Sequence, residues 1–167
     1  MASLQAQKEQ SVKGANYVNA GIGLGTYGFY GTGPMPNVLG TYELVAFTKH
    51  PLNTDNEVKT AFDTIERHIC GIFTQVANYS FIAALNPGDT CEIPQDKKET
   101  ICMIFDAYQL EGKPFMVGER EHHLLLCIEL FRTEMEFSRA NGSDKLFELL
   151  DAAGYYPYCD MDRKAVA

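Results

Sequence analysis

The feature that most constrains the fold is a long stretch with helical periodicity between residues 54 and 79. Its apolar residues recur every three or four positions, at Val58, Phe62, Ile65, Ile69, Ile72, Phe73 and Val76. Thr54 followed by Glu57 is a capping-box pattern, so the helix is predicted to begin there. Because a helix with one apolar stripe must bury it, the rest of the chain has to supply a sheet or another helix as cover.

Three segments are typical of the strands of such a sheet. Residues 41–48 are rich in β-branched and aromatic residues, and 100–108 and 123–130 are almost continuously apolar. The alternate residues of the first strand form two faces, Tyr42, Leu44 and Ala46 against Glu43, Val45 and Phe47. Weaker patterns predict strands over 16–24 and 81–85, whereas 91–99 is polar and is predicted to be a loop.

Two short helices are predicted near the C-terminus. Thr133 and Glu136 form a second capping-box pattern, Asn141-Gly142 ends the first helix, and Ser143 begins another that Gly154 stops. The predicted fold class is α+β: a mostly antiparallel mixed sheet covered by one long helix, with a C-terminal helical pair. A length of 167 residues fits one domain, with residues 1–13 as a polar lead-in and 14–167 as the domain.

The charge balance restricts the partners. Lys and Arg number 14 and Asp and Glu 22, a formal charge of −8, and the basic residues are scattered, which argues against nucleic acid. An acidic surface would steer a basic protein toward it, although a solvated surface without a partner is the alternative. The polar N-terminus is no signal peptide, no apolar run is long enough for a membrane span, and five cysteines without a Cys-x-x-Cys pair favour a cytoplasmic protein.

A glycine-rich segment, residues 21–40, holds the spacing of a dinucleotide fingerprint at Gly23, Gly25 and Gly28. That fingerprint requires a helix directly after it, and the glycines and prolines that follow exclude one. We therefore predict a flexible loop without a cofactor.

No catalytic or metal-binding residues are predicted. His122 and His123 would point to opposite faces of a strand, so the two side chains cannot readily chelate one ion. The acid pairs Glu134/Glu136 and Asp160/Asp162 are interpreted as solvated surface, and Cys102 and Cys127 as inert core thiols.

The C-terminal half resembles a known family. The apolar strand 123–130 leads directly into the Thr-Glu helix 133–138, then Asn141-Gly142-Ser143 and the leucine-rich helix 146–150. This order resembles the suppressor-of-fused-like domain, in its bacterial single-domain type. The resemblance implies a mixed α/β domain without known catalysis, whose members act by holding other proteins. The animal member sequesters a transcription factor in Hedgehog signalling, and many bacterial relatives look like immunity proteins against secreted toxins.

The sequence thus predicts a non-enzymatic protein-binding domain, an immunity-type or regulatory inhibitor that sequesters a protein partner. The candidate partner-binding residues are Tyr27, Phe29, Tyr30, Glu119, Glu121, Asp160 and Asp162. One alternative is a small-molecule enzyme or ligand-binding protein that uses the loop 21–40 as a lid. Another is a homodimer that packs through Tyr155, Tyr156 and Tyr158.

Overall fold

The computed structural model describes residues 16–18, 42–53, 57–80, 82–95, 100–108, 115–117 and 120–167. Within strands 16–18, 115–117 and 120–122 it describes the backbone alone. The predicted lead-in 1–13 and the glycine-rich loop 21–40 lie outside the described residues.

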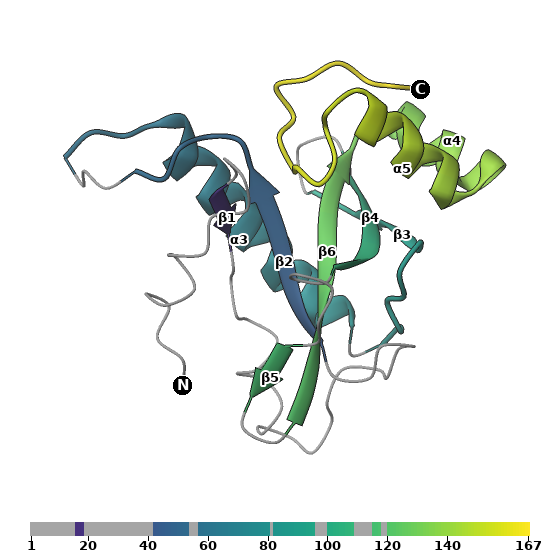
Figure 1. Ribbon diagram of the computed structural model, residues 1–167, viewed down its shortest axis with the longest axis horizontal. Helices are drawn as coiled ribbons and strands as arrows, with labels where there is room; N and C mark the ends of the chain where they lie inside the picture. Colours follow the sequence, from purple (N-terminus) through teal and green to yellow (C-terminus); the bar gives the residue numbers. More distant parts are fainter. Residues whose placement is uncertain are drawn as a thin grey trace.

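The centre of the fold is a sheet with strand order β1-β2-β6-β4-β3, to which β5 adds by pairing with β6 (Figure 1). The strands are β1 (Asn16–Val18), β2 (Tyr42–Thr48), β3 (Thr90–Ile93), β4 (Ile101–Tyr108), β5 (Phe115–Val117) and β6 (Arg120–Leu130). Only the β2–β6 pair is parallel; the other described pairs are antiparallel. The mixed, mostly antiparallel sheet is therefore confirmed.

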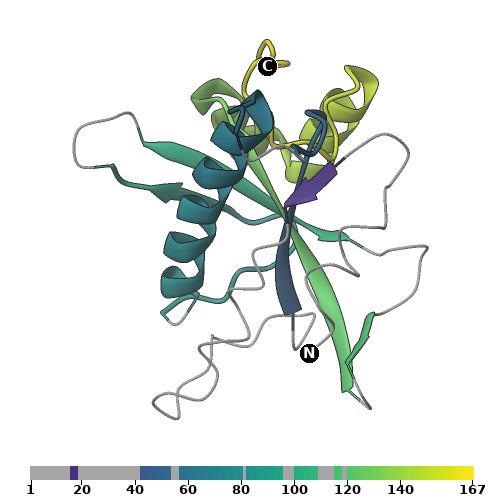
Figure 2. The same cartoon turned by 90° about the vertical axis from the view of Figure 1, so that its left-hand side faces the viewer.

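The long helix α3 (Ala61–Tyr79) covers one face of this sheet. Its buried residues Phe62, Ile69, Phe73 and Val76 join the apolar residues of that face in one core cluster. Figure 2 shows α3 running beside the sheet, while the C-terminal helices gather at one end of the molecule with the C-terminus. The apolar stripe thus finds the cover that its periodicity requires.

The C-terminal helices α4 (Arg132–Asn141) and α5 (Ser143–Ala152) pack on the second face. Met135, Leu146 and Leu150 are fully buried there against β2, β4 and β6. The alternation of β2 is as predicted: Tyr42, Leu44 and Ala46 belong to the α3 core, and Val45 and Phe47 to the second core. All seven residues of β2 are buried, because both faces of the sheet are covered.

Both helix starts differ from their predicted capping boxes. The helix α3 begins at Ala61, where the Thr60 N–H donates to the Asp63 carboxylate at 2.6 Å. In α4 the Phe131 N–H donates to Glu134 at 2.9 Å, so the helix begins before Thr133. In each case an acidic residue three positions beyond the cap closes the first turn.

One strand prediction and part of one loop prediction near β4 are wrong. Residues 82–85 form no strand, because the Ile82 and Ala83 N–H groups both donate to the Tyr79 carbonyl, and Ile82 is 75% exposed. Conversely, part of the predicted loop 91–99 is the edge strand β3, which buries Cys91 and Ile93 and exposes Glu92. Four residues are too short a window for their alternation to stand out in the sequence.

Candidate protein-binding surface

The chain after α5 packs against the ends of strands β2 and β6. The parallel register joins Tyr42–Val45 of β2 to His123–Leu126 of β6. Beyond that register the Cys159 N–H donates to the Phe47 carbonyl at 2.8 Å, beside a parallel bridge between Phe47 and Tyr158. From β6, the Glu129 N–H donates to the Cys159 sulfur at 3.3 Å. The C-terminal segment, residues 155–167, is therefore wedged between the ends of two strands.

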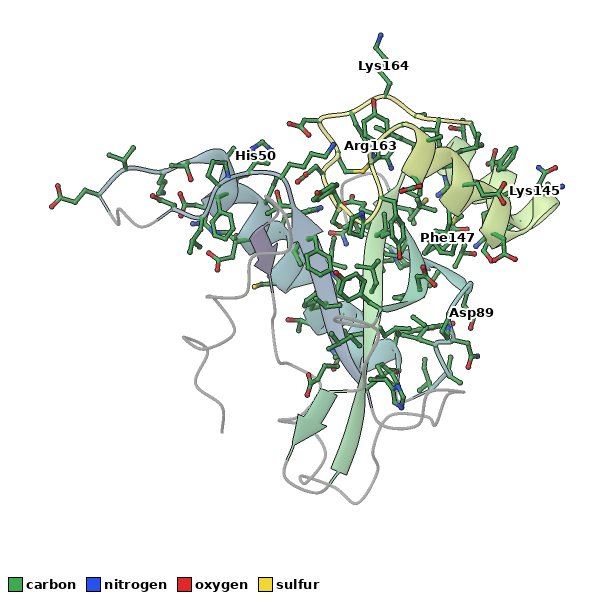
Figure 3. The ribbon with its side chains drawn as sticks, viewed as in Figure 1. His50, Asp89, Lys145, Phe147, Arg163 and Lys164 are labelled. Carbon is green, nitrogen blue, oxygen red and sulfur yellow. The ribbon has the colours of Figure 1, made fainter. Side chains whose placement is uncertain are left out.

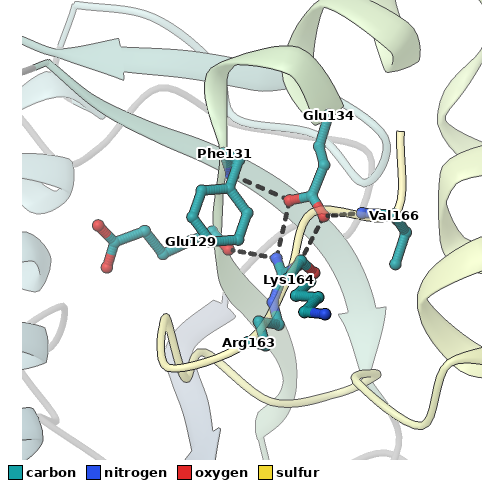
Figure 4. Close-up of polar contacts among 6 residues, drawn as sticks. All are labelled: Glu129, Phe131, Glu134, Arg163, Lys164 and Val166. Carbon is teal, nitrogen blue, oxygen red and sulfur yellow. Dashed lines mark hydrogen bonds and ion pairs between the residues drawn. The ribbon is translucent and has the colours of Figure 1, made fainter.

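A buried ion pair fixes this segment (Figure 4). The Arg163 guanidinium donates to both carboxylate oxygens of Glu134, at 2.5 and 2.8 Å, and the two side chains are 4% and 0% exposed. Glu134 also accepts the N–H groups of Phe131 and Val166, and the Phe131 and Tyr155 rings lie 5.0 and 5.2 Å from the guanidinium carbon. The prediction of a solvated Glu134 is wrong, because distant donors satisfy its charge.

The two candidate aspartates of the C-terminal segment have different surroundings. Asp160 is 4% exposed and accepts the Thr48 hydroxyl and the Lys49 N–H at the end of β2. The prediction of a solvated acid pair is therefore wrong for Asp160, whose carboxylate is used inside the fold. The Asp162 side chain is 67% exposed and lies 3.3 Å from the His50 ring nitrogen, so it remains accessible to a partner.

The other sequence candidates are not brought together in the described structure. Tyr27, Phe29, Tyr30 and Glu119 lie outside the described residues. Glu121 is placed by its backbone, which pairs with Met116 of β5. Their role in binding stays a prediction.

The aromatic residues Tyr155, Tyr156 and Tyr158 pack on the body of the same chain. Each is half-buried against the second core, and the Tyr156 hydroxyl donates to Asp106 at 2.9 Å. The homodimer that they were predicted to form stays a prediction.

The outward side of α5 presents three acids at helical spacing. Asp144, Glu148 and Asp151 are all exposed and, at i, i+4 and i+7, lie on one side of the helix. We call these three residues the α5 acidic stripe; Leu149 beside it is also exposed. Figure 3 shows Lys145 at the outer side of this helix and Phe147 toward the sheet. The spacing of these three acids is already visible in the sequence.

Two positive charges of α4 are already paired, whereas Lys145 of α5 lies beside the stripe. Arg132 and Arg139 of α4 both contact the Glu92 carboxylate of β3, at 3.1 and 2.9 Å. This pairing joins the edge strand to α4 and neutralises part of the basic charge near α5. The α5 acidic stripe is thus the clearest accessible acidic feature of this end of the molecule.

Among the described residues, Glu43 is a buried acid without a hydrogen-bond partner. It is 4% exposed, lies on the same face of β2 as Val45 and Phe47, and neither carboxylate oxygen has a hydrogen bond to a described group. Burial raises the pKa of Glu43 from its ordinary 4.5 to about 7. Buried polar groups in folded proteins are nearly always hydrogen-bonded, which makes this residue an exception. The sequence already shows Glu43 as the one charged residue of the strand 42–48.

Most of the cysteines are buried in the fold. Cys91, Cys102, Cys127 and Cys159 are buried free thiols, as predicted for Cys102 and Cys127, and burial raises the pKa of Cys91 to about 11. Within the described residues no three His, Cys, Asp or Glu side chains are grouped to hold a metal ion. No helix in the described ranges combines the length and apolar character needed to cross a membrane.

Comparison with protein families decides the relationship that the sequence suggested. Residues 37–164, well over half of the chain, match the model of the suppressor of fused protein (SUFU) family. The chain belongs to the suppressor-of-fused family. Searches of curated proteins and of solved structures find no significant match.

The suppressor-of-fused match extends from just before β2 to Lys164. It therefore includes most of the C-terminal segment, with Arg163, the α5 acidic stripe and Glu43. The resemblance over 123–150 corresponds to most of β6, α4 and most of α5, which contribute to the second core together with β2 and β4.

Proposed function

We propose that this suppressor-of-fused domain is a non-enzymatic, cytoplasmic protein-binding domain that inhibits its partner by holding it, as an immunity-type or regulatory inhibitor. The family match over residues 37–164 is the observation that carries the proposal, because it supports a regulatory, protein-binding role. The partner is a basic protein. A formal charge of −8 favours such a partner through electrostatic complementarity and faster encounter.

The α5 acidic stripe is the part of the described surface that best suits this role. Its three carboxylates are exposed, and Leu149 adds accessible apolar area beside them. Exposed charges at an interface chiefly raise the association rate and its salt dependence, whereas buried contacts hold the complex. Asp162 extends the accessible acidic surface at the C-terminal segment.

The test is capture of a partner by the tagged full chain from lysate of the native cells, at low and at high salt, with identification by mass spectrometry. The stripe variant, Asp144→Asn with Glu148→Gln and Asp151→Asn, is compared with a control that removes the same charge elsewhere, Glu57→Gln with Glu66→Gln and Glu136→Gln.

We expect a basic protein at low salt, less of it at high salt, and a greater loss for the stripe variant than for the control. Recovery of no protein at either salt would contradict the proposed function. Equal losses in both variants would contradict the assignment to the stripe.

A further inference from the structure

The unpartnered carboxyl of Glu43 belongs to a row of residues across three strands. The register places Glu43 of β2 beside Leu124 of β6, and Leu124 beside Tyr108 of β4, so the three side chains share the second face. Leu124 and Tyr108 are only partly buried, and the Tyr108 ring lies 4.8 Å from that of Phe47. The row thus runs from a buried carboxyl past an aromatic ring toward accessible surface.

The described groups on this face supply no positive charge to Glu43. From β4 the ionisable groups are Asp106 and Tyr108, and from the C-terminal segment they are Tyr156 and Tyr158, which are all acids. Next along this face from Leu124, β6 contributes Leu126 on one side and the position of His122, described by its backbone alone, on the other. The nearby cations are engaged elsewhere, since the Lys49 ammonium donates to the Gly154 carbonyl and Arg163 binds Glu134.

The buried Glu134 is stabilised by an arginine of the same chain. Glu134 is fully buried, and it is held by a two-pronged guanidinium that lies between two aromatic rings. Glu43 has the same two carboxylate oxygens and an aromatic ring in the same row, but no guanidinium of the described residues binds it. A planar guanidinium matches a carboxylate in two parallel hydrogen bonds and stacks on aromatic rings, whereas an ammonium is more strongly hydrated.

We propose that Glu43, Leu124 and Tyr108 form the receptor for an arginine side chain of the protein partner. The arginine enters from the Tyr108 side, its aliphatic stem packs on the Tyr108 ring and on Leu124, and its guanidinium donates to both oxygens of Glu43. This inference rests on the proposed protein-binding function and names the chemistry of one partner residue. Since the cation requires the ionised carboxylate, binding releases a proton from Glu43.

The direct test is titration of the isotopically labelled full chain with N-acetyl-arginine amide, followed by nuclear magnetic resonance at pH 6 and pH 8. We expect saturable shifts at Glu43, Leu124 and Tyr108, with binding about tenfold tighter at pH 8, because a carboxyl with a pKa of about 7 is mostly protonated at pH 6. The uncharged N-acetyl-citrulline amide should cause no saturable shift.

The variant Glu43→Gln should lose arginine-amide binding, and Glu136→Gln, an exposed control, should keep it. No saturable shift in the native chain, or unchanged binding in Glu43→Gln, would overturn the inference. Equal affinity for N-acetyl-lysine amide would overturn the assignment to arginine.

The capture experiment separates this inference from the function on which it rests. We expect Glu43→Gln to recover at least tenfold less partner than the native chain, and Glu136→Gln to recover as much. If the native chain captures no partner, the proposed function fails. If Glu43→Gln captures the partner as well as the native chain does, the proposed function stands and the arginine receptor is refuted.

Discussion

Replacing Glu43 by glutamine should change how the stability of the protein depends on pH. In the unfolded chain this carboxyl loses its proton near pH 4.5, whereas burial in the folded chain raises its pKa to about 7. Between these values the folded state binds more protons than the unfolded state, so the free energy of unfolding falls as the pH rises. The stabilisation is fully present below pH 4.5 and is lost above pH 7.

The size of the effect follows from the same pKa values. Each unit of difference corresponds to ~1.4 kcal/mol, so the folded protein loses roughly 2.5 kcal/mol from this group between pH 5 and pH 8. Glutamine has nearly the same shape and does not titrate. From pH 5 to pH 8 the unfolding free energy of Glu43→Gln should therefore rise by that amount relative to the unfolding free energy of the native chain.

The assay is urea unfolding of both proteins at pH 5, 6, 7 and 8, with Glu136→Gln as a control for the loss of an exposed carboxyl. The unfolding free energy of the control should change with pH as that of the native chain does. If the unfolding free energy of Glu43→Gln also changes with pH in this way, Glu43 is not the buried, unpaired acid that the structure describes, and the reasoning is refuted.

Three further predictions concern the C-terminal segment and the thiols. Replacing Arg163 by alanine leaves Glu134 buried without its counter-charge and should lower the unfolding free energy by about 3–5 kcal/mol in urea; a loss below about 1 kcal/mol would contradict a buried pair. Replacing Asp160 by alanine removes the acceptor of the Lys49 N–H and should lower the unfolding free energy by about 1–3 kcal/mol, which thermal unfolding would show as a lower midpoint temperature. An unchanged midpoint temperature would refute the anchoring role. Iodoacetamide should modify the half-buried Cys70 before the buried cysteines, which mass spectrometry of the native protein would show; simultaneous modification of all would contradict their burial.

The longer helices and strands could be predicted because the pattern of apolar residues that indicates them is local in the sequence. The apolar runs at 100–108 and 123–130 correspond to β4 and β6, and the stripe at 62–76 to α3. Val58, predicted as its first member, lies before the helix and is 58% exposed, so that part of the prediction is wrong. The prediction failed for a short segment whose apolar pattern is weak. The strand predicted over 81–85 is not formed by the described residues 82–85, because the Ile82 and Ala83 N–H groups donate to the Tyr79 carbonyl just after the helix ends.

The candidate site was less predictable, because burial of a charged residue depends on its partners. Asp160 and Asp162 are two residues apart, yet only Asp160 meets donors from the end of β2. The α5 acidic stripe is visible in the sequence as a helical spacing, but its accessibility follows only once Leu146 and Leu150 are packed on the other side.

The sequence by itself determined which segments have an apolar side, since periods of two and of about 3.6 residues are properties of neighbouring positions. It also carried enough of the family's order of elements for the relationship to be recognised. Only the tertiary structure decided which charges are buried and whether they are satisfied. Glu134 meets Arg163 from 29 positions further along the chain, and Glu43 meets no donor among the described residues. The distances between charged groups are set by the packing of strands and helices and not by their separation in sequence.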